Sequence, residues 1–501
     1  MKKLFVSRSR EHSKEQGVTI LLVAAAMVAI IGMAVLSIDV VTLYLAKEEA
    51  QRSADAAALA AARLLSVSGI TGDPANSTSN WGAVCGASGA ALLVAQAVAA
   101  QNIVGNQAAP TVTVTYSAGS AGTVGPGNSD CTNLSSSAFG VNPMVTVKVT
   151  QTGLPNFFSR IWSRSGNSVS ATATAEAFNP SGSGSSGNQT SGTITPVQPR
   201  CVKPWVVPNQ NPLIPAPVGA NYCNMAGGPG ACHTLVGLTD GSITDSGISL
   251  NGGDGSHVIG ETFWLAPDCD NGNPNYCKLL NSGAEQPQAN YNDGTGLQKG
   301  PPNLLSAPGQ VGTPVTAVPS CSGGDPYEEA IEGCDSPTNY QCGVLNQNAV
   351  DLTKHNPGVN SITNAVQCLI HQTDTTNLTS SSGQDYLNAT VTFGDPSAYP
   401  FQILAGSSNP LGAGLAGTPI PSSNSIVSLP IYDQTTVPLA SDAVTKVTFI
   451  GFLQVFINAV DGHGNRLVTV LNVSGCGNGT NPTGSPVHGS SPVPVRLITP
   501  P

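Results

Sequence analysis

The pattern of hydrophobic and polar residues divides the chain into an apolar stretch near the N-terminus, a helix rich in small residues and a long polar body. Residues 16–38 form a run of 23 residues without a charge. As a helix of about 1.5 Å rise per residue, this run would be ~35 Å long, enough to cross a hydrocarbon core of ~30 Å. The pattern therefore predicts a transmembrane helix.

The helical pattern continues beyond this run. Glu48 and Arg52 are spaced i,i+4, and neither Gly nor Pro follows Asp39 until Gly69. A strip of alanines recurs at i,i+3 and i,i+4 steps: Ala46, Ala50, Ala54, Ala57, Ala58, Ala61 and Ala62. The strip has two interpretations, which stay open here. Small residues let another backbone approach closely, and alanine is also the best helix former.

After the long helix, the pattern predicts a small region of mixed structure. Residues 86–104 are a second helix candidate, and residues 111–116, 144–151 and 168–178 alternate with the period of two that is typical of strands. Residues 156–162 could form a short helix. The region is therefore expected to be α+β.

A Gly/Ser/Thr-rich linker follows at residues 179–199 and leads into a second region of short strands. The clearest strand candidates are residues 425–432, 443–459 and 466–473, and residues 460–465 between the last two are a hairpin loop. The fold class is therefore expected to be α+β, with the second region rich in β-structure, disulfides and long loops.

The expected organisation has six segments. They are a cytoplasmic basic tail (1–16), a transmembrane and continuing helix (17–65), a membrane-proximal α+β domain (66–178), the linker (179–199), a β-rich disulfide-bonded domain (200–480) and a flexible tail (481–501).

The charges that flank the apolar run predict its orientation. Five basic residues precede it, whereas only Lys47 and Arg52 occur in the twenty positions after it. This asymmetry places the N-terminus in the cytoplasm and the bulk of the chain in the periplasm or outside the cell, attached to the inner membrane by a single span. Asp39 would then lie at the outer membrane–water boundary, where its carboxylate can stay hydrated.

Two alternatives compete with an uncleaved anchor. A cleaved signal peptide has an apolar region of only ~7–15 residues followed by a small-residue cleavage site. Here the run is longer and the helix continues past it, which favours the anchor. The other alternative is a buried helix of a soluble protein.

Composition narrows the class of protein further. Charged residues make up 10 % of the chain, against a usual ~25 %. The net charge is −10, and no basic cluster occurs outside the first sixteen residues. Since binding to phosphates needs a clustered basic face, nucleic acid is not an expected partner.

All twelve cysteines lie after the apolar run. An even number in an exported region predicts disulfides, and there is no CxxC motif to suggest a zinc ribbon or a thioredoxin-like site. Cys85 and Cys131 are alone in the first region and are expected to pair. The pairing of the other ten stays open.

The strongest resemblance lies in the N-terminal helix. Gly17 before the apolar run, Asp39 after it, Tyr44, and the phrase AQRSADAAALA at residues 50–60 resemble the N-terminal module of TadE/TadG-like Flp pilus-assembly proteins. The resemblance covers residues 17–64. It implies anchor and packing roles for five residues: Gly17, Asp39, Ala54, Asp55 and Ala58.

The resemblance also implies a pilin-like plan, in which a long N-terminal helix precedes a small sheet. One position departs from that plan. Type IV-like prepilins have a glutamate at the fifth position after the cleaved glycine, and this chain has Leu22 there. The departure argues against processing by a prepilin peptidase and against assembly as a major pilin subunit.

Two loops have a composition suited to metal ions. Asp240 and Ser242 lie in a D-x-S-x-T sequence that resembles the metal-adhesion loop of von Willebrand factor A-like domains. Asp268 and Asp270 lie in a sequence with the composition of a calcium loop, but the glycine and glutamate that an EF-hand loop needs are missing. Asp-Gly and Asx-rich turns explain both sequences more simply, so no metal site is expected.

No catalytic motif accompanies the anchor. G-x-S-x-G and H-E-x-x-H are absent, and the seven histidines are dispersed. The leading hypothesis is a non-catalytic, membrane-anchored extracytoplasmic component of a Tad/Flp-type pilus or related surface-assembly apparatus, without a cofactor. Its expected partners are the membrane and pilus-assembly or envelope proteins. One alternative is a surface adhesin with a divalent-cation-dependent distal domain, and another is an anchored secreted hydrolase.

Overall fold

The structure is a computed structural model that describes about half of the chain. The described residues are 12–71, 81–107, 110–118, 124–135, 139–140, 143–155, 166–177, 197–199, 202–209, 235–236, 262–266, 288–290, 321, 328, 331–333, 345–346, 348–351, 359–388, 402–420, 422–433, 444–462, 464–475, 487–489 and 493–498.

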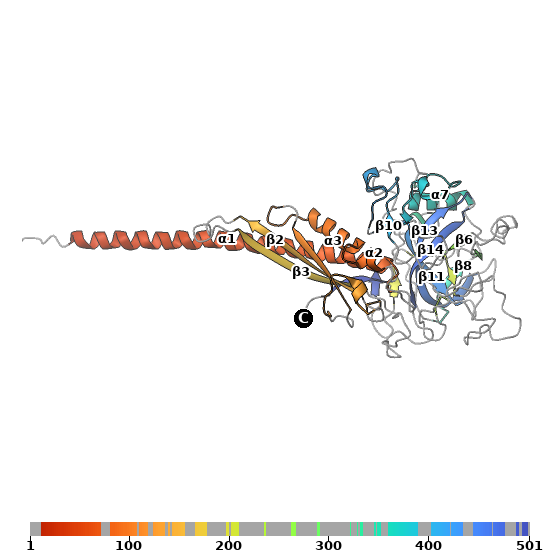
Figure 1. Cartoon of the computed structure of the whole chain (residues 1–501), viewed down its shortest axis with the longest axis horizontal. Coiled ribbons are helices and arrows are strands. Elements are labelled where there is room, and N and C mark those ends of the chain that lie inside the picture. Colours follow the sequence, from red (N-terminus) through yellow and green to blue (C-terminus); the bar gives the residue numbers. More distant parts are fainter. Residues whose placement is uncertain are drawn as a thin grey trace, which may run out of the picture.

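A single long helix, α1 (His12–Val67), leads into two folded parts that lie one after the other along it (Figure 1). With 56 residues it is ~84 Å long at about 1.5 Å per residue. The first domain is built around the second half of α1, and the second domain lies at the far end of that helix. Each domain has its own hydrophobic core.

Two short helices cover α1 in the first domain: α2 (Trp81–Cys85) and α3 (Ala90–Gln101). The sequence predicted one helix over residues 86–104, but the chain turns between the two helices at Gly86 and Gly89. A Cβ at Gly89 would lie 2.6 Å from the backbone oxygen of Val84, so this turn needs glycine.

The sheet of the first domain has the order β1-β2-β3-β16 and is antiparallel throughout. Its strands are β1 (Thr111–Ala118), β2 (Pro143–Leu154), β3 (Asn167–Ala177) and β16 (Val495–Ile498). Val145, Val147 and Val149 of β2 are buried in the core, whereas Lys148 points to the exposed face. The first three strands lie where the alternating pattern predicts them, within two or three residues at each end. The helix expected at residues 156–162 falls outside the described residues.

The fourth strand comes from the C-terminal region, which the sequence analysis expected to be a flexible tail. Within that region, β16 pairs with β3 from Val495↔Ala177 to Ile498↔Thr174. Val493, just before it, is buried in the core of the first domain. Arg496 and Glu176 face each other across the pair and form an ion pair in which the Glu176 side chain is fully buried. The structure therefore differs from the expectation here, because burial of Val493 and this ion pair hold the segment in place.

The second domain is centred on a six-stranded mixed sheet of order β5-β11-β13-β14-β6-β7. The strands are β5 (Val207–Pro208), β6 (Thr262–Ala266), β7 (Gln288–Asn290), β11 (Ile426–Tyr432), β13 (Phe449–Val460) and β14 (Arg466–Gly475). All twelve residues of β13 are buried, so both of its faces are covered. The amphipathic helix α7 (Val359–Ile370) packs against β13.

The strand predicted over residues 443–459 is two strands in the structure. β12 (Val444–Val447) pairs with β8 (Asn348–Asp351), whereas β13 joins the six-stranded sheet. The break is at Thr448, whose side-chain oxygen accepts from the backbone N–H of Asn346 at 2.9 Å. The backbone carbonyl of Thr448 accepts from the N–H of Asp433 at 3.0 Å. These bonds replace the regular ladder at one position and redirect the chain.

Several short elements complete the described part of the chain. They are β4 (Val197–Pro199), which pairs in parallel with β15 (Val487–Gly489), the pair β9 (Tyr386–Leu387) and β10 (Ile403–Leu404), and the 3₁₀ turns η2 (Cys131–Asn133), η5 (Ser380–Ser382) and η7 (Ala413–Leu415). The chain thus has the expected α+β composition, a long apolar N-terminal helix followed by sheets and a few helices.

Replacement of Arg496 by alanine tests whether β16 is part of the first domain. The substitution leaves the buried Glu176 carboxylate without its cationic partner, so we expect the free energy of unfolding of the first domain to fall by about 1–3 kcal/mol. Chemical denaturation followed by tryptophan fluorescence measures the loss.

The double variant Glu176→Gln, Arg496→Ala is the matched control. It removes the buried charge together with its partner, so its loss should be smaller than that of Arg496→Ala alone. Equal stability of the wild type and of Arg496→Ala would contradict a structural role for the strand.

Candidate functional site

The N-terminal half of α1 stands free of the rest of the protein. Its large apolar side chains between Val18 and Ile38 are between about half and three quarters exposed, except for the partly buried Val35. By length and composition, residues 18–67 could cross a membrane, and so could residues 81–101, although half of the apolar window in the second stretch is buried within the protein. An apolar helix surface of this size is unfavourable in water and is stabilised by lipid.

Asp39 marks the point at which the protein begins to cover α1. Its side chain is only 4 % exposed, although its neighbours Ile38 and Val40 are 49 % and 56 % exposed. The structure therefore does not have the hydrated carboxylate that the sequence analysis expected. The reason is helical spacing, because Asp39, Ala46 and Ala50 lie on one face of α1, and that face is turned toward the first domain.

The alanine strip packs inside the first domain. Ala50, Ala54, Ala57, Ala58, Ala61 and Ala62 are fully buried in its core, among the valines of the sheet and the alanines of α3. Side chains of this size let α1 approach both the sheet and α3 closely. Of the two interpretations of the strip, close packing is what the structure contains, and the packing partner is the chain itself.

Polar side chains of α1 bind the edge of the sheet next to it. β16 pairs only with residues 174–177 of β3, and before that point α1 lies along the strand. Lys47 donates to the carbonyl of Ser170, and Gln51 donates to the carbonyl of Thr172 at 3.3 Å. Gln51 also donates to Asp55 at 2.8 Å, so Asp55 orients a side chain that binds the strand. These bonds satisfy two backbone carbonyls on the side of β3 where, among the described strands, β16 pairs only with residues 174–177.

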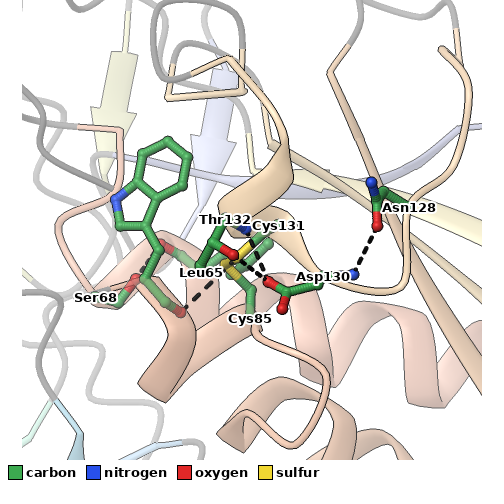
Figure 2. Close-up of a disulfide and its surroundings, with 8 residues drawn as sticks. Leu65, Ser68, Cys85, Asn128, Asp130, Cys131 and Thr132 are labelled. Atoms are coloured by element: carbon green, nitrogen blue, oxygen red, sulfur yellow. Dashed lines mark hydrogen bonds between the residues drawn. A yellow bond between two sulfur atoms is a disulfide. The ribbon is translucent and has the colours of Figure 1, made fainter. Parts of the chain in front are cut away.

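A disulfide joins α2 to η2 in the first domain (Figure 2). Cys85 at the end of α2 is bonded to Cys131 in η2, the pair that the sequence singled out. Trp81 and Tyr116 pack around Phe139, with ring centroids 5.3 and 6.3 Å away.

Asp130 shapes the turn that carries Cys131. Its carboxylate accepts from the side chain of Thr132 at 2.7 Å and from the backbone N–H of Thr132 at 2.9 Å (Figure 2). These hydrogen bonds hold the pKa of Asp130 below its usual value.

The C-terminal end of α1 enters the second domain. Val67 belongs to the core of that domain. Asn472 of β14 donates to the carbonyl of Ser66 at 2.8 Å and to the hydroxyl of Thr71 at 2.9 Å. The amide of Asn472 thereby satisfies one of the carbonyls that a helix end leaves without an intrahelical partner. One helix therefore belongs to both cores.

The second domain contains a buried lysine. Lys203 Nζ donates to the carbonyls of Ile331 and Gly333 at 2.7 and 2.6 Å. Burial lowers the pKa of Lys203 to about 7, while the nearby Glu332 has the opposite effect. Both acceptors belong to one short segment, so the side chain joins that segment to the sheet.

Ser, Asp and His residues occur together at one place in the described part of the second domain. Asp385 accepts from the N–H of Gly406 and from the amide of Asn409, each at 2.8 Å, and from Ser423 Oγ. His371 Nε2 lies 3.1 Å from the side-chain amide nitrogen of Asn424. Because Ser423 donates to the carboxylate, this network ties loops together and lacks the serine–histidine contact of a nucleophilic site.

The structure does not describe the metal candidates of the sequence analysis. Asp240, Ser242, Asp268 and Asp270 are all outside the described residues. Within the part of the chain that the structure describes, there is no group of three or more His, Cys, Asp or Glu residues that could hold a metal ion.

The comparisons with known proteins agree with the N-terminal helix. Residues 17–64 match the model of a family described as Flp pilus-assembly TadE/G-like. This part of the chain is therefore similar to that family, over the same residues for which the sequence analysis found the resemblance. No curated protein and no solved structure matches the chain significantly.

Sequence reasoning missed several residues that position the module. Lys47, Gln51 and Asn472 bind backbone carbonyls, and Glu176 with Arg496 closes the sheet. Asn472 and Arg496 lie more than 300 residues from their partners in sequence. A polar residue within an otherwise apolar strand is a weak signal of such a contact, and Asn472 in RLVTVLNV is an example.

Replacement of Ala58 by leucine tests the close approach between α1 and the sheet. Ala58 is fully buried, so the larger side chain must displace the sheet or α3, and we expect a loss of about 1–3 kcal/mol in the stability of the first domain. The matched control is Ala60→Leu, half-buried on the same helix, which should cost less. Equal losses in thermal unfolding would contradict this packing.

Removal of the disulfide by Cys85→Ala and Cys131→Ala should destabilise the first domain by about 2–4 kcal/mol, since it releases a loop of 46 residues in the unfolded chain. The second described disulfide, Cys321–Cys368, closes a loop of 47 residues in the second domain and provides a matched control. Removal of the Cys321–Cys368 disulfide should speed proteolysis of the second domain and leave the rate for the first domain unchanged. Loss of both domains in either variant would contradict separate roles.

Proposed function

We propose that this protein is a membrane-anchored, extracytoplasmic component of a Tad/Flp-type pilus or a related surface-assembly apparatus, and that its role is structural rather than catalytic. The match of residues 17–64 to the TadE/G-like family carries the proposal. That match covers the helix that is exposed and apolar in its first half and packed in its second.

The charge pattern supports an orientation. The five basic residues before the apolar stretch lie on the cytoplasmic side, and the two folded domains lie on the opposite side. The chain then crosses the inner membrane once. The stretch 81–101, which contains α2 and α3, stays in the first domain, because half of its apolar window is buried within the protein.

The rest of the architecture suits an envelope scaffold. The two described disulfides fit an oxidising compartment outside the cytoplasm. Because α1 is shared by both cores, a load on the second domain is transmitted directly to the membrane helix. The second domain is the part that would meet pilus-assembly or other envelope proteins.

Disruption of the gene in its source cells tests this function. We expect surface filaments to be lost and to return with the wild-type chain. A chain carrying Val28→Asp should not restore them, because a charge at the middle of the apolar helix opposes insertion by about 2.5–3.5 kcal/mol. The matched control is Leu45→Asp at the outer end of the exposed apolar face, beyond the uncharged run, which should insert.

Two readouts separate anchoring from assembly. Membrane fractionation and protease accessibility in spheroplasts should place both domains outside the cytoplasm. If the protein is anchored in this way but its loss leaves filaments unchanged, the assembly role is wrong. If the wild-type chain is recovered in the soluble fraction, the anchor itself is wrong.

A further inference from the structure

The exposed apolar surface of α1 does not end where the uncharged run ends. Beyond Asp39, the side chains of Val40, Val41, Tyr44 and Leu45 are 56 %, 56 %, 65 % and 55 % exposed. They follow directly from Leu36 and Ile38, which are about half exposed. On this face of the helix, exposed charged residues begin only at residues 47–49.

The length of this surface matches a complete bilayer. From Val18 to Leu45 the exposed apolar face covers 28 residues, or ~42 Å at about 1.5 Å per residue. A hydrocarbon core is ~30 Å thick, and a bilayer with its headgroup layers is ~40–45 Å thick. The uncharged run alone therefore corresponds to the core, whereas the exposed face corresponds to the core and both headgroup layers.

Tyr44 has the chemistry of a residue at the membrane interface. Measured from the middle of the exposed face, it lies ~19 Å along the helix, which is in the outer headgroup layer. Tyrosine is enriched at this depth because its ring is apolar and its hydroxyl is polar. A position in the headgroup layer accounts for the exposure of the Tyr44 ring.

The opposite face of α1 at this level is covered by the first domain. Ala46, next to Leu45, is buried, and a Cβ at Gly105 would lie 3.5 Å from the Cβ of Ala46. The N–H of Gly105 donates to Glu49 at 2.7 Å, so the loop after α3 lies next to the turn of α1 that follows Leu45. The end of the first domain that faces the apolar segment thus lies within about one helical turn of Leu45.

This end of the first domain has no charged residue of its own where the structure describes it, and the Glu49 carboxylate of α1 lies beside it. It consists of the loop at residues 102–107 and the end of β2, which Gln107 joins through a 3.0 Å bond to the carbonyl of Gly153. Ile103 is 58 % exposed here, and Asn106, Thr152 and Gly153 are exposed as well. A neutral polar rim with an exposed isoleucine is compatible with lipid headgroups.

We propose that the first domain rests directly on the outer headgroup layer. Tyr44 and Leu45 lie in that layer, Val40 and Val41 lie at the outer end of the hydrocarbon core, and the 102–107 loop contacts the headgroup surface. The lipid surface is the partner of this face of α1. This inference rests on the proposed membrane anchor, and it moves the outer boundary of the bilayer from Asp39 to Leu45 on the exposed face.

Photo-crosslinking in the full-length protein tests the proposal. The photoreactive residue p-benzoylphenylalanine replaces Val28, Tyr44 or Arg52 in separate variants, and each is reconstituted in vesicles of phosphatidylethanolamine and phosphatidylglycerol that contain an alkyne-tagged phospholipid. Arg52 is the matched control, because it is exposed on the same face of α1 two turns beyond Tyr44.

We expect lipid adducts at Val28 and Tyr44 in similar yield. The yield at Arg52 should be about one tenth or less, since that position is ~12 Å farther from the membrane along the helix. Circular dichroism of each variant checks that the helix and the domains are folded.

Each other outcome has one meaning. Adducts at Val28 but not at Tyr44 overturn the headgroup contact and leave the anchor intact. No adduct at Val28 overturns the anchor. A protein–protein adduct at Tyr44 in place of lipid overturns the proposal in favour of contact between two copies of α1, and an equal lipid yield at Arg52 would show that the bilayer boundary is not at Leu45.

Discussion

The close approach between α1 and the sheet of the first domain is the contact on which the rest of the structure depends. It exists because the buried face of the helix is made of alanines, whose methyl groups leave room for the valines of the sheet on one side and for α3 on the other. Once the sheet lies this close, Lys47 and Gln51 can reach the carbonyls of β3. The same helix continues into the exposed apolar segment without a break, so the packing of the alanines also sets the orientation of the domain relative to the membrane helix.

The two domains are joined at more than one place. The end of α1 is buried in the second core, where Asn472 binds the carbonyl of Ser66. β4 and β15 pair with each other; β4 forms the last three residues of the Gly/Ser/Thr-rich segment 179–199, and β15 precedes β16. β16 then returns to the first sheet. A connection through a single flexible linker would let the second domain reorient freely, whereas these contacts restrict it.

Local patterns predicted the local elements well. The long helix, the first three strands and the strands β11, β13 and β14 lie close to their predicted positions, because each has a clear period or a long apolar run. The features that the sequence could not supply depend on distant partners. β16 is held by Glu176, which is 320 residues away, and Cys321 pairs with Cys368 rather than with a nearer cysteine. Asp39 resembles a membrane-boundary residue in sequence, and only the folded domain shows that it is covered. At Thr448 the β-pattern continues through the break, since hydrogen bonds to distant backbone groups cause it.

The return of β16 has a consequence for the order in which the protein can mature. A chain that is translocated from its N-terminal anchor outward presents β1, β2 and β3 early, but the strand that completes their sheet follows the whole second domain. Until then, Glu176 has no arginine beside it and the final residues of β3 keep an open edge. The sheet of the first domain is therefore complete only in a full-length chain, because a product that stops before Val495 lacks β16. Such a product would be a target for proteases, because the end of β3 stays unpaired.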